Sequence, residues 1–407
     1  MDTFRINLGK SNTWNFTRDP KSIQHILQKN QKNYHKSDLQ TKDLGKYIGH
    51  GLLTSNGETW RVHRRMIQPT FHKKKLQGLL GIMHQTIQRE LEEITPNEVQ
   101  DVYPIMGDLA FQVVAQSLFS ADDIRNRMLR LKAITMNIQE MLVKELRMPY
   151  LGWWFRLKGE VKQHLEESDE AREILNKIVD ERVVNNIDKD DLLDMLLGAR
   201  YEDDTPMSRR QLLDEVMVLF TAGHETTANA LSFTLCLIAK HTDIQEKVFQ
   251  EIQQVDLEAK DILAEIGKLK FTKQCIEETL RLYPPLFILD RISINTDVVD
   301  SREFDKGTVW LMSFFELHRH PDFWKYPDTF MPERFDPEHK KDVSNWYFPF
   351  GAGPRMCIGN NFAMYEMVLT VAELVKNFKL ESGTEEITMN PLLTLKPEQA
   401  VLKFIPR

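Results

Sequence analysis

The chain has 407 residues, of which 42% are hydrophobic and 28% are charged, as is typical of a globular protein with a sizeable core. Its formal net charge of −7 argues against nucleic acid as a partner. No apolar run approaches the roughly 18 residues that a membrane span needs, and residues 1–10 hold no signal-peptide core. These features predict a cytoplasmic protein that does not require a membrane.

Two short strands are predicted at the N-terminus, at residues 4–8 and 13–16, with a Gly/Asn turn between them. A helix over about residues 20–28 follows, and then a long polar loop over 30–51, a length that is usually functional in a compact domain. Further on, Trp60 and Arg64 are spaced i, i+4 on a predicted helix, so that an indole N–H and a guanidinium share one face. The neighbouring His63 is a second anion contact or a surface residue.

Apolar residues at every third or fourth position predict mostly helices from residue 76 to residue 186. The aromatic segment 148–155 interrupts this pattern, and it is a lid tip, a membrane-facing patch or core packing between two helices. A short helix at 190–198 precedes a long helix that reaches about residue 240. Ser208 and Gln211 form a capping box at the start of the long helix.

The middle of the long helix has the sequence Ala-Gly-His-Glu-Thr-Thr over residues 222–227. The small Ala222 and Gly223 leave a groove in which a flat ring could lie. Glu225 is costly to bury on an otherwise apolar helix, and this favours a functional role. The Thr226 hydroxyl can distort the helix and admit water, which predicts a proton path. A glycine-weakened helix with an incidental Thr pair is the structural alternative.

A later helix, which we expect Thr272 to cap, ends before residue 284. It carries Glu278 and Arg281 at i, i+3, the spacing of an ion pair, and Arg334 follows in a Pro-Glu-Arg-Phe turn. A strand is predicted at 308–315. The two histidines that follow it, His318 and His320, have no third metal ligand at a suitable spacing and are interpreted as structural.

Three cysteines are present, and they form no C-x-x-C pair, which suits a reducing compartment without a zinc site or disulfide framework. Cys236 and Cys275 fall in apolar helical patterns and are expected to be core thiols. Cys357 stands between glycines just ahead of a predicted helix, whose free N–H groups and dipole would keep a thiolate ionised. With Arg355 able to reach a carboxylate, the loop describes an axial ligand of haem iron, the alternative being a buried free thiol.

This loop resembles the haem-binding loop of the cytochromes P450, Phe-x-x-Gly-x-Arg-x-Cys-x-Gly. Residues 222–227 resemble the oxygen-activation motif of that family, and the Trp60–Arg64 spacing resembles its propionate-binding pair. The resemblance runs from Phe4 to Ile405, in the style of microsomal fatty-acid hydroxylases. All specified positions of the cysteine loop are present: Phe350, Gly353, Arg355, Cys357 and Gly359.

The resemblance implies a mainly α cytochrome P450 fold as a single domain over 1–407, with a small β-rich lobe at 1–20 and 286–315. The family's first helix is expected to be missing at the N-terminus. Cys357 would bind the iron of haem b, with Ala222, Gly223 and Arg291 also against the haem. Further implied roles are proton delivery to O2 by Thr226 and Glu225, a structural triad of Glu278, Arg281 and Arg334, and an apolar substrate pocket of Phe220, Leu286, Phe287 and Leu393.

The implied activity is that of a monooxygenase, an iron-containing oxidoreductase that hydroxylates or O-dealkylates an apolar molecule. Because no reductase is fused, a separate ferredoxin- or flavodoxin-type donor with its reductase would supply electrons to a monomer. A peroxide-using or rearranging haem-thiolate enzyme and a non-enzymatic haem sensor are the alternatives. Fatty acids, terpenoids, steroids and a small methyl ether are all open as substrates.

Overall fold

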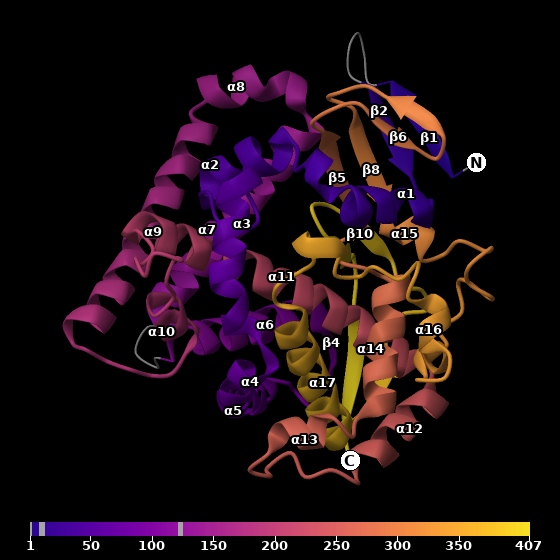
Figure 1. Ribbon diagram of the computed structural model, residues 1–407. Helices are drawn as coiled ribbons and strands as arrows, with labels where there is room; N and C mark the ends of the chain where they lie inside the picture. The colour runs from indigo at the N-terminus through magenta and orange to yellow at the C-terminus, as the bar shows by residue number, and fades with distance from the viewer. Residues whose placement is uncertain (1, 8–12, 121–124) are drawn as a thin grey trace. The chain divides into compact units, whose positions relative to one another are not determined.

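Helices dominate the computed structural model, which describes residues 2–7, 13–120 and 125–407 (Figure 1). None of the helices within these ranges is long and apolar enough to cross a membrane. The helices are α1 Pro20–Gln24, α2 Gly45–Ile48, α3 Gly57–Ile67, α4 Lys73–Leu76, α5 Leu80–Leu91, α6 Val102–Phe119, α7 Arg125–Arg147, α8 Gly152–Leu157, α9 Glu160–Val184, α10 Leu192–Leu197, α11 Arg209–Lys240, α12 Thr242–Ile252, α13 Ile262–Ile266, α14 Lys270–Leu282, α15 Phe314–Leu317, α16 Lys340–Val343 and α17 Asn360–Asn377. The 3-10 or π-helical turns that matter below are η1 His25–Lys29, η4 Gln68–Phe71, η7 Pro149–Leu151, η8 Pro332–Phe335 and η9 Gly353–Arg355.

The strands form small sheets, the largest of which has five strands in the order β1-β2-β8-β5-β3. Strands β2 and β8 run parallel, and the other neighbours in this sheet are antiparallel. This sheet is the β-rich lobe that the sequence predicted, although the predicted Gly/Asn turn lies outside the described residues. The strands are β1 Thr3–Asn7, β2 Thr13–Thr17, β3 Tyr34–His35, β4 Val99–Asp101, β5 Ile288–Ser293, β6 Asp297–Val299, β7 Arg302–Phe304, β8 Val309–Ser313, β9 Phe378–Ser382, β10 Met389–Pro391, β11 Leu395–Pro397 and β12 Val401–Pro406.

The chain divides into two compact units, and each is built from separate segments. Helices α6 and α11 each contribute residues to both. Unit 1 comprises Met1–Ser37, His84–Ala110 and Glu225–Arg407, and unit 2 comprises Asp38–Met83 and Phe111–His224.

An apolar cluster in unit 1 fixes the segment that leads into the cysteine loop. Ile23, Trp310 and Phe314 are fully buried in it, and Phe348 is 5% exposed. Burying side chains of this size contributes about 2 kcal/mol each relative to leaving them in water. Phe348 therefore anchors the start of the loop to the sheet lobe.

The start of α14 corrects one expectation from the sequence, because Thr272 does not cap this helix. Leu269 is the residue before the first turn, and Thr272 lies inside the helix. The Glu251 carboxylate from α12 accepts the Phe271 N–H at 2.7 Å and the Thr272 N–H at 2.8 Å. A carboxylate from another helix thus satisfies the free N–H groups of the first turn. The predicted cap of α11 is present, because Ser208 Oγ accepts the Gln211 N–H at 3.2 Å.

Candidate functional site

The cysteine loop has a backbone that is fixed before the cysteine is reached. Gly353 has a φ of +71°, and a Cβ there would lie 1.9 Å from the Leu27 carbonyl oxygen, so only glycine fits. The Cys357 N–H then donates to the Phe350 carbonyl at 2.9 Å. Helix α17 begins at Asn360, so the cysteine lies just ahead of a helix N-terminus, as predicted.

The three thiols differ as the sequence analysis expected. Cys236 is 2% exposed and Cys275 is fully buried, whereas Cys357 is exposed. Burial raises the pKa of Cys236 to about 12, so this thiol stays protonated. Of the three, only Cys357 has a setting in which a thiolate is expected.

The charge of Arg355 acts on two other basic side chains of unit 1, Arg291 and His35. Burial, and after it the charge of Arg355, lowers the pKa of Arg291 on β5 to about 10. Burial likewise lowers the pKa of Arg355 to about 10, and burial followed by the charge of Arg355 lowers the pKa of His35 on β3. The Arg291 guanidinium, 5% exposed, donates from Nη1 to the Asp290 carbonyl at 2.7 Å.

Two guanidinium groups that repel one another in a partly buried setting are stabilised by an anion. Arg291 and Arg355 therefore suit a ligand that carries carboxylate groups, and the neutral imidazole of His35 can add a hydrogen bond to such a ligand. His35 was not predicted as a site residue, because only the pairing of β3 with β5, across a large sequence separation, brings His35 close to Arg291. No local motif marks that pairing.

Helix α11 presents one open face in its middle. Ala222 is exposed and Glu225 and Thr226 are half-buried, and their i, i+3 and i+4 spacing puts all three on one side of the helix. Gly223 does not contribute to a groove as expected, because a Cβ there would meet Val114 Cγ2 at 3.1 Å. The glycine instead lets α11 pack closely on α6, and Ala222 alone leaves room for a flat group.

The Glu225 carboxylate is held by a residue that the sequence analysis missed. Thr394 Oγ1 donates to Glu225 Oε1 at 2.9 Å and accepts from Asn229 Nδ2 at 3.0 Å. Glu225 and Asn229 lie one turn apart on α11, and Thr394 lies between β10 and β11, next to Leu393. The hydroxyl thus joins the tip of the β10–β11 hairpin to the acidic side chain of the helix.

The predicted charge triad is brought together in the core of unit 1. Arg281 donates to both Glu278 oxygens, from Nε at 2.7 Å and from Nη2 at 2.8 Å. Arg334 on η8 donates from Nε to Glu278 Oε1 at 3.1 Å. The side chains of Glu278 and Arg281 are fully buried. Such bidentate pairs combine strength with a fixed geometry, as expected for a structural element.

Unit 2 contains the predicted Trp60–Arg64 pair on α3. Trp60 is 7% exposed, and the half-buried Arg64 donates from Nε to Gln68 Oε1 at 3.2 Å. His63 is buried, with Nδ1 at 3.3 Å from a Glu215 oxygen and Nε2 at 3.2 Å from the Tyr201 hydroxyl. The expectation of a surface position for His63 is therefore wrong, because it belongs to a polar network inside unit 2.

The residues expected to line a substrate pocket differ in burial. Phe220 is 1% exposed and packs edge-on against Phe111, with ring centroids 5.0 Å apart. This packing places Phe220 in the core of unit 2 rather than at a pocket. In unit 1, the side chains of Leu286, Phe287 and Leu393 are half-buried.

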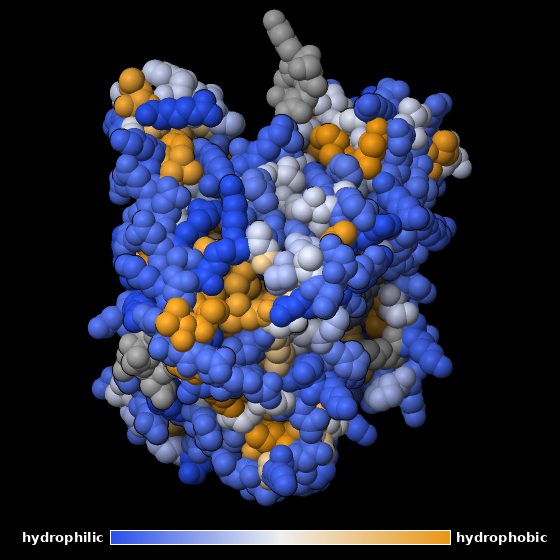
Figure 2. All heavy atoms as spheres, turned by 60° about the vertical axis from the view of Figure 1, so that its left-hand side comes forward, coloured by the Kyte–Doolittle hydropathy of each residue, from blue (hydrophilic) through white to orange (hydrophobic). Residues whose placement is uncertain are grey.

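The aromatic segment 148–155 lies mostly at the surface of unit 2. Tyr150 on η7 is 71% exposed and Trp153 on α8 is 63% exposed, whereas Phe155 is 5% exposed. Apolar side chains are visible at the surface of the molecule among hydrophilic ones (Figure 2). Core packing is therefore the correct interpretation for Phe155 alone, and the lid and membrane interpretations stay open for the exposed residues.

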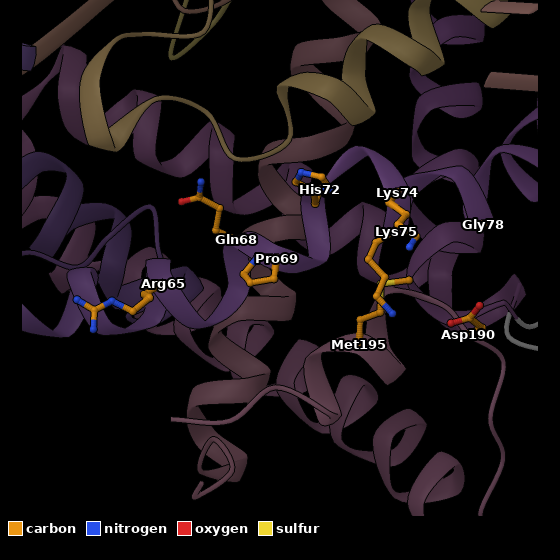
Figure 3. Close-up of a pocket in the computed structure, with 9 residues that line it drawn as sticks. All are labelled: Arg65, Gln68, Pro69, His72, Lys74, Lys75, Gly78, Asp190 and Met195. Carbon is orange, nitrogen blue, oxygen red and sulfur yellow. The ribbon is translucent and has the colours of Figure 1, made fainter. Parts of the chain in front are cut away.

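A separate pocket of about 800 Å³ lies in unit 2, and none of the predicted site residues lines it. Basic side chains of α3 and α4 line it, together with residues of η4, Asp190 and Met195 (Figure 3). Arg65 at its edge forms an ion pair with Glu202. The lining residues are Arg65, Gln68, Pro69, His72, Lys74, Lys75, Gly78, Asp190 and Met195.

Comparison with known proteins shows the family. The family model for cytochrome P450 matches residues 1–404. Cytochrome P450 4d2 of Drosophila melanogaster is 31% identical over 399 residues, which cover 90% of this chain and 78% of that protein. The putative cytochrome P450 132 of Mycobacterium bovis is 29% identical, over 94% of this chain and 85% of its own length. Leukotriene-B4 omega-hydroxylase 3 of Mus musculus is 29% identical, over 87% of this chain and 73% of its own length.

Solved structures show the same fold. The haem domain of cytochrome P450DA superposes with a TM-score of 0.86 at 21% identity, and a mutant of that domain with 0.89 at 22%. Both comparisons cover the whole of this chain and 90% of the other. The chain thus belongs to the cytochrome P450 family and is a haem-thiolate monooxygenase. Its activity requires haem, O2 and an electron-donating partner.

The residues described here fit a haem. The two guanidinium groups of Arg291 and Arg355, with the imidazole of His35 beside them, suit the two propionate groups, which are the only charged substituents of the porphyrin. A Cβ placed on Gly359, two residues after Cys357, would meet nothing within 4 Å, so the loop has open space at this position. The donor set therefore agrees with the family assignment.

Proposed function

We propose that this protein hydroxylates or O-dealkylates an apolar small molecule with haem b as its cofactor. Cys357 would ligate the iron, and a bound haem with a thiolate ligand supplies the chemistry that splits O2 and inserts one oxygen atom. The observation that supports this most directly is the pairing of an acid and an alcohol, Glu225 and Thr226, on the open face of α11. The same helix face carries Ala222, whose small side chain leaves room for a flat ring.

In this proposal, Glu225 and Thr226 move protons. The Thr226 hydroxyl donates a proton at the open face. It then regains a proton, through water, from the Glu225 carboxyl group. General acid catalysis of this kind typically contributes a factor of about 10² to 10⁴. Thr394 keeps the carboxylate oriented, because its hydroxyl donates to Glu225 Oε1 at 2.9 Å.

The remaining predicted residues hold the cofactor in this proposal. Charged side chains would bind the propionates, and small or flat residues would line the porphyrin. Leu286, Phe287 and Leu393, all half-buried, would contact the apolar substrate. The proposed propionate ligands are Trp60, Arg64, Arg291, Arg355 and His35, and the proposed ring contacts are Ala222, Phe350, Gly353 and Gly359.

A separate, acidic electron-transfer protein of the ferredoxin or flavodoxin type is the proposed donor. The pocket of Figure 3 supports this, since Lys74 and Lys75 are exposed there in a chain whose net charge is −7. Opposite charges steer protein association and lose this effect in salt. Lys74→Glu with Lys75→Glu should slow reduction about tenfold at low salt, whereas Lys162→Glu on α9 should not. Equal rates for all variants would contradict the proposed docking surface.

The substrate proposal is tested by adding ligands to the purified, haem-loaded protein. Because one relative is named as a leukotriene-B4 omega-hydroxylase, long-chain fatty acids are the first class to screen, before terpenoids, steroids and methyl ethers. An apolar ligand is expected to shift the iron spin state and then to be hydroxylated with O2 and a reductant. If no ligand class shifts the spectrum, the proposal of an apolar substrate pocket is wrong. If hydrogen peroxide alone supports turnover as fast as O2 with a reductant does, the monooxygenase cycle is not the main reaction.

The thiolate ligand has its own test. The reduced carbon monoxide complex of the wild type should show the red-shifted Soret band of a thiolate-bound haem. Cys357→His should move this band to that of an imidazole-bound haem and abolish monooxygenase activity, whereas Cys236→Ser and Cys275→Ser should leave the spectrum unchanged. An unshifted band in folded, haem-loaded wild type would contradict the role of Cys357.

A further inference from the structure

One histidine and two glutamates from three different segments converge in unit 1. His84 lies on α5, Glu373 on α17, and Glu258 in the loop between α12 and α13. His84 Nε2 is 2.6 Å from Glu373 Oε1, and one ligand atom from each of the three residues lies within 4.8 Å of the others. His84 and Glu373 are buried and Glu258 is exposed, so the cluster opens to solvent on one side.

Each carboxylate in this cluster is oriented by an amide side chain. Gln88, one turn after His84 on α5, donates from Nε2 to Glu258 Oε1 at 2.8 Å. Asn377, one turn after Glu373 on α17, donates from Nδ2 to Glu373 Oε2 at 3.4 Å and to the Glu373 carbonyl at 2.8 Å. Outer hydrogen-bond partners of this kind hold the ligands of metal sites in position.

The charges of the cluster are not balanced by its own members. Two carboxylates face one imidazole, so the three side chains carry a net charge of −2 when the imidazole is neutral, and Lys376 adds one positive charge near Glu373. The His84–Glu373 pair is complete without Glu258, whose carboxylate brings a further negative charge to the cluster. A divalent cation would balance both carboxylates and accept the imidazole nitrogen at the same time.

We propose that His84, Glu258 and Glu373 bind one divalent metal ion, with Zn2+ as the preferred ion, at a site separate from the haem. One imidazole nitrogen and two carboxylate oxygens belong to the donor set that zinc uses, and zinc ranks above manganese and ferrous iron for such ligands. Tetrahedral coordination at about 2.0 to 2.2 Å requires ligand atoms roughly 3.3 Å apart. The 2.6 Å contact between His84 Nε2 and Glu373 Oε1 would open to this spacing when the ion binds, and the exposed Glu258 can move towards the ion.

The bound ion would join α5, α17 and the loop between α12 and α13. Helix α17 follows directly on the cysteine loop, so the ion would stabilise the helix whose N-terminus lies just after Cys357. Its role is structural, and the proposal does not depend on which substrate the enzyme oxidises.

The test uses the haem-loaded protein after treatment with EDTA, titrated with ZnCl2 in a calorimeter and followed by thermal unfolding. We expect one Zn2+ per chain and a rise in Tm upon binding. Glu258→Gln keeps the size of an exposed side chain but removes a ligand charge, so affinity should fall at least tenfold and the rise in Tm should disappear. Glu258→His offers a new ligand and should retain binding, and Glu93→Gln near the end of α5 is a matched control that should change neither value.

Two outcomes would overturn the proposal. The first is wild-type protein that binds no Zn2+ at 100 μM, a concentration chosen to detect even a weak site. The second is wild-type affinity in Glu258→Gln, which would place the ion elsewhere. The test relies on Glu258 because its side chain is exposed. Replacing the buried His84 would also destabilise the fold, so His84→Asn serves only as confirmation.

Discussion

Two buried arginine sites in unit 1 differ in how their charge is balanced. Arg281 donates to both Glu278 oxygens and to the carbonyls of His318, Pro327 and Thr329 at 2.6 to 3.2 Å. Arg291, in contrast, donates to the carbonyl of Asp290, and the nearby charge of Arg355 lowers its pKa further. Arg281 is held by two hydrogen bonds to a carboxylate, whereas Arg291 lies under the opposing charges of Arg355 and Asp290.

This difference separates a structural site from a ligand site. A buried ion pair with all its donors satisfied gives rigidity, and a break in it leaves an uncompensated charge. A buried group of like charges lowers stability until a ligand compensates it, which is the usual character of a binding site. The two sites should therefore respond in opposite ways to removal of the arginine.

Arg281→Met is expected to have the largest effect. It leaves the fully buried Glu278 carboxylate with Arg334 as its remaining cation, and breaking a buried pair typically costs about 3 to 5 kcal/mol. We expect a fall of this size in the free energy of unfolding, measured by urea titration, and poor haem incorporation during expression. A variant with wild-type stability would show that the triad is not needed for folding.

Acidification should weaken the balanced site through His318. Its Nε2 accepts the Phe348 N–H at 2.9 Å, and burial, followed by the charges of Arg281 and Arg319, lowers its pKa to about 3. Because the unfolded pKa is about 6.5, the neutral imidazole stabilises the fold above pH 6.5, and this contribution is lost as pH falls towards 3. At pH 5, about 1.5 units below the unfolded pKa, the free energy of unfolding should be lower by about 2 kcal/mol, since each unit corresponds to 1.36 kcal/mol.

The control for this effect is His318→Gln, whose amide oxygen can accept the same N–H but does not titrate. Urea midpoints measured at pH 7.5 and pH 5 should therefore converge for the variant, apart from the contributions of other groups. An equal loss of stability in both proteins would assign the acid sensitivity to other residues.

Arg291→Gln tests the unbalanced site and should have a smaller effect of a different kind. We expect little change in the stability of the protein without haem, because a repelled buried cation has been removed. Haem should be lost about tenfold faster, corresponding to about 1.4 kcal/mol of lost propionate binding. Transfer of haem to apomyoglobin measures this rate.

Arg319→Gln is a matched control for Arg291→Gln. Burial also lowers the pKa of Arg319 to about 10. Unlike Arg291, Arg319 stacks on an aromatic ring, with its Cζ 3.9 Å from the centroid of Phe315. Arg319→Gln should lower the free energy of unfolding and leave the rate of haem loss unchanged. If both variants lost haem equally fast, the Arg291 cluster would have no special part in binding.

The sequence predicted the features that depend on local spacing. The cysteine loop ahead of α17 and the Glu278–Arg281 pair follow from residues within one loop or one helix turn. The expectation for Phe220 failed, because helix periodicity marks a residue as apolar but does not say which partner it packs against. Tertiary packing decides that question.

Features that join distant segments could not be predicted from spacing. Thr394 is 169 residues from Glu225 and 165 residues from Asn229, yet it binds both. Strand pairing places His35 opposite Ile292, next to Arg291, and Glu251 caps α14 from a neighbouring helix. Each of these contacts is made by a common polar residue, whose role depends on the fold and leaves no motif in the sequence.

The smallest expected effect belongs to Thr394→Val, which removes the hydroxyl that orients Glu225. Because Thr226 would still deliver protons, we expect product per electron to fall about threefold, against at least tenfold for Thr226→Ala, with the balance appearing as hydrogen peroxide. Thr394→Ser keeps the hydroxyl and should restore coupling. The solvent isotope effect on peroxide release should rise in Thr394→Val and not in Thr394→Ser, because only the former loosens the proton donor. If Thr394→Val and Thr394→Ser behaved alike, the residue would matter for the shape of the β10–β11 hairpin and not for the orientation of the Glu225 carboxylate.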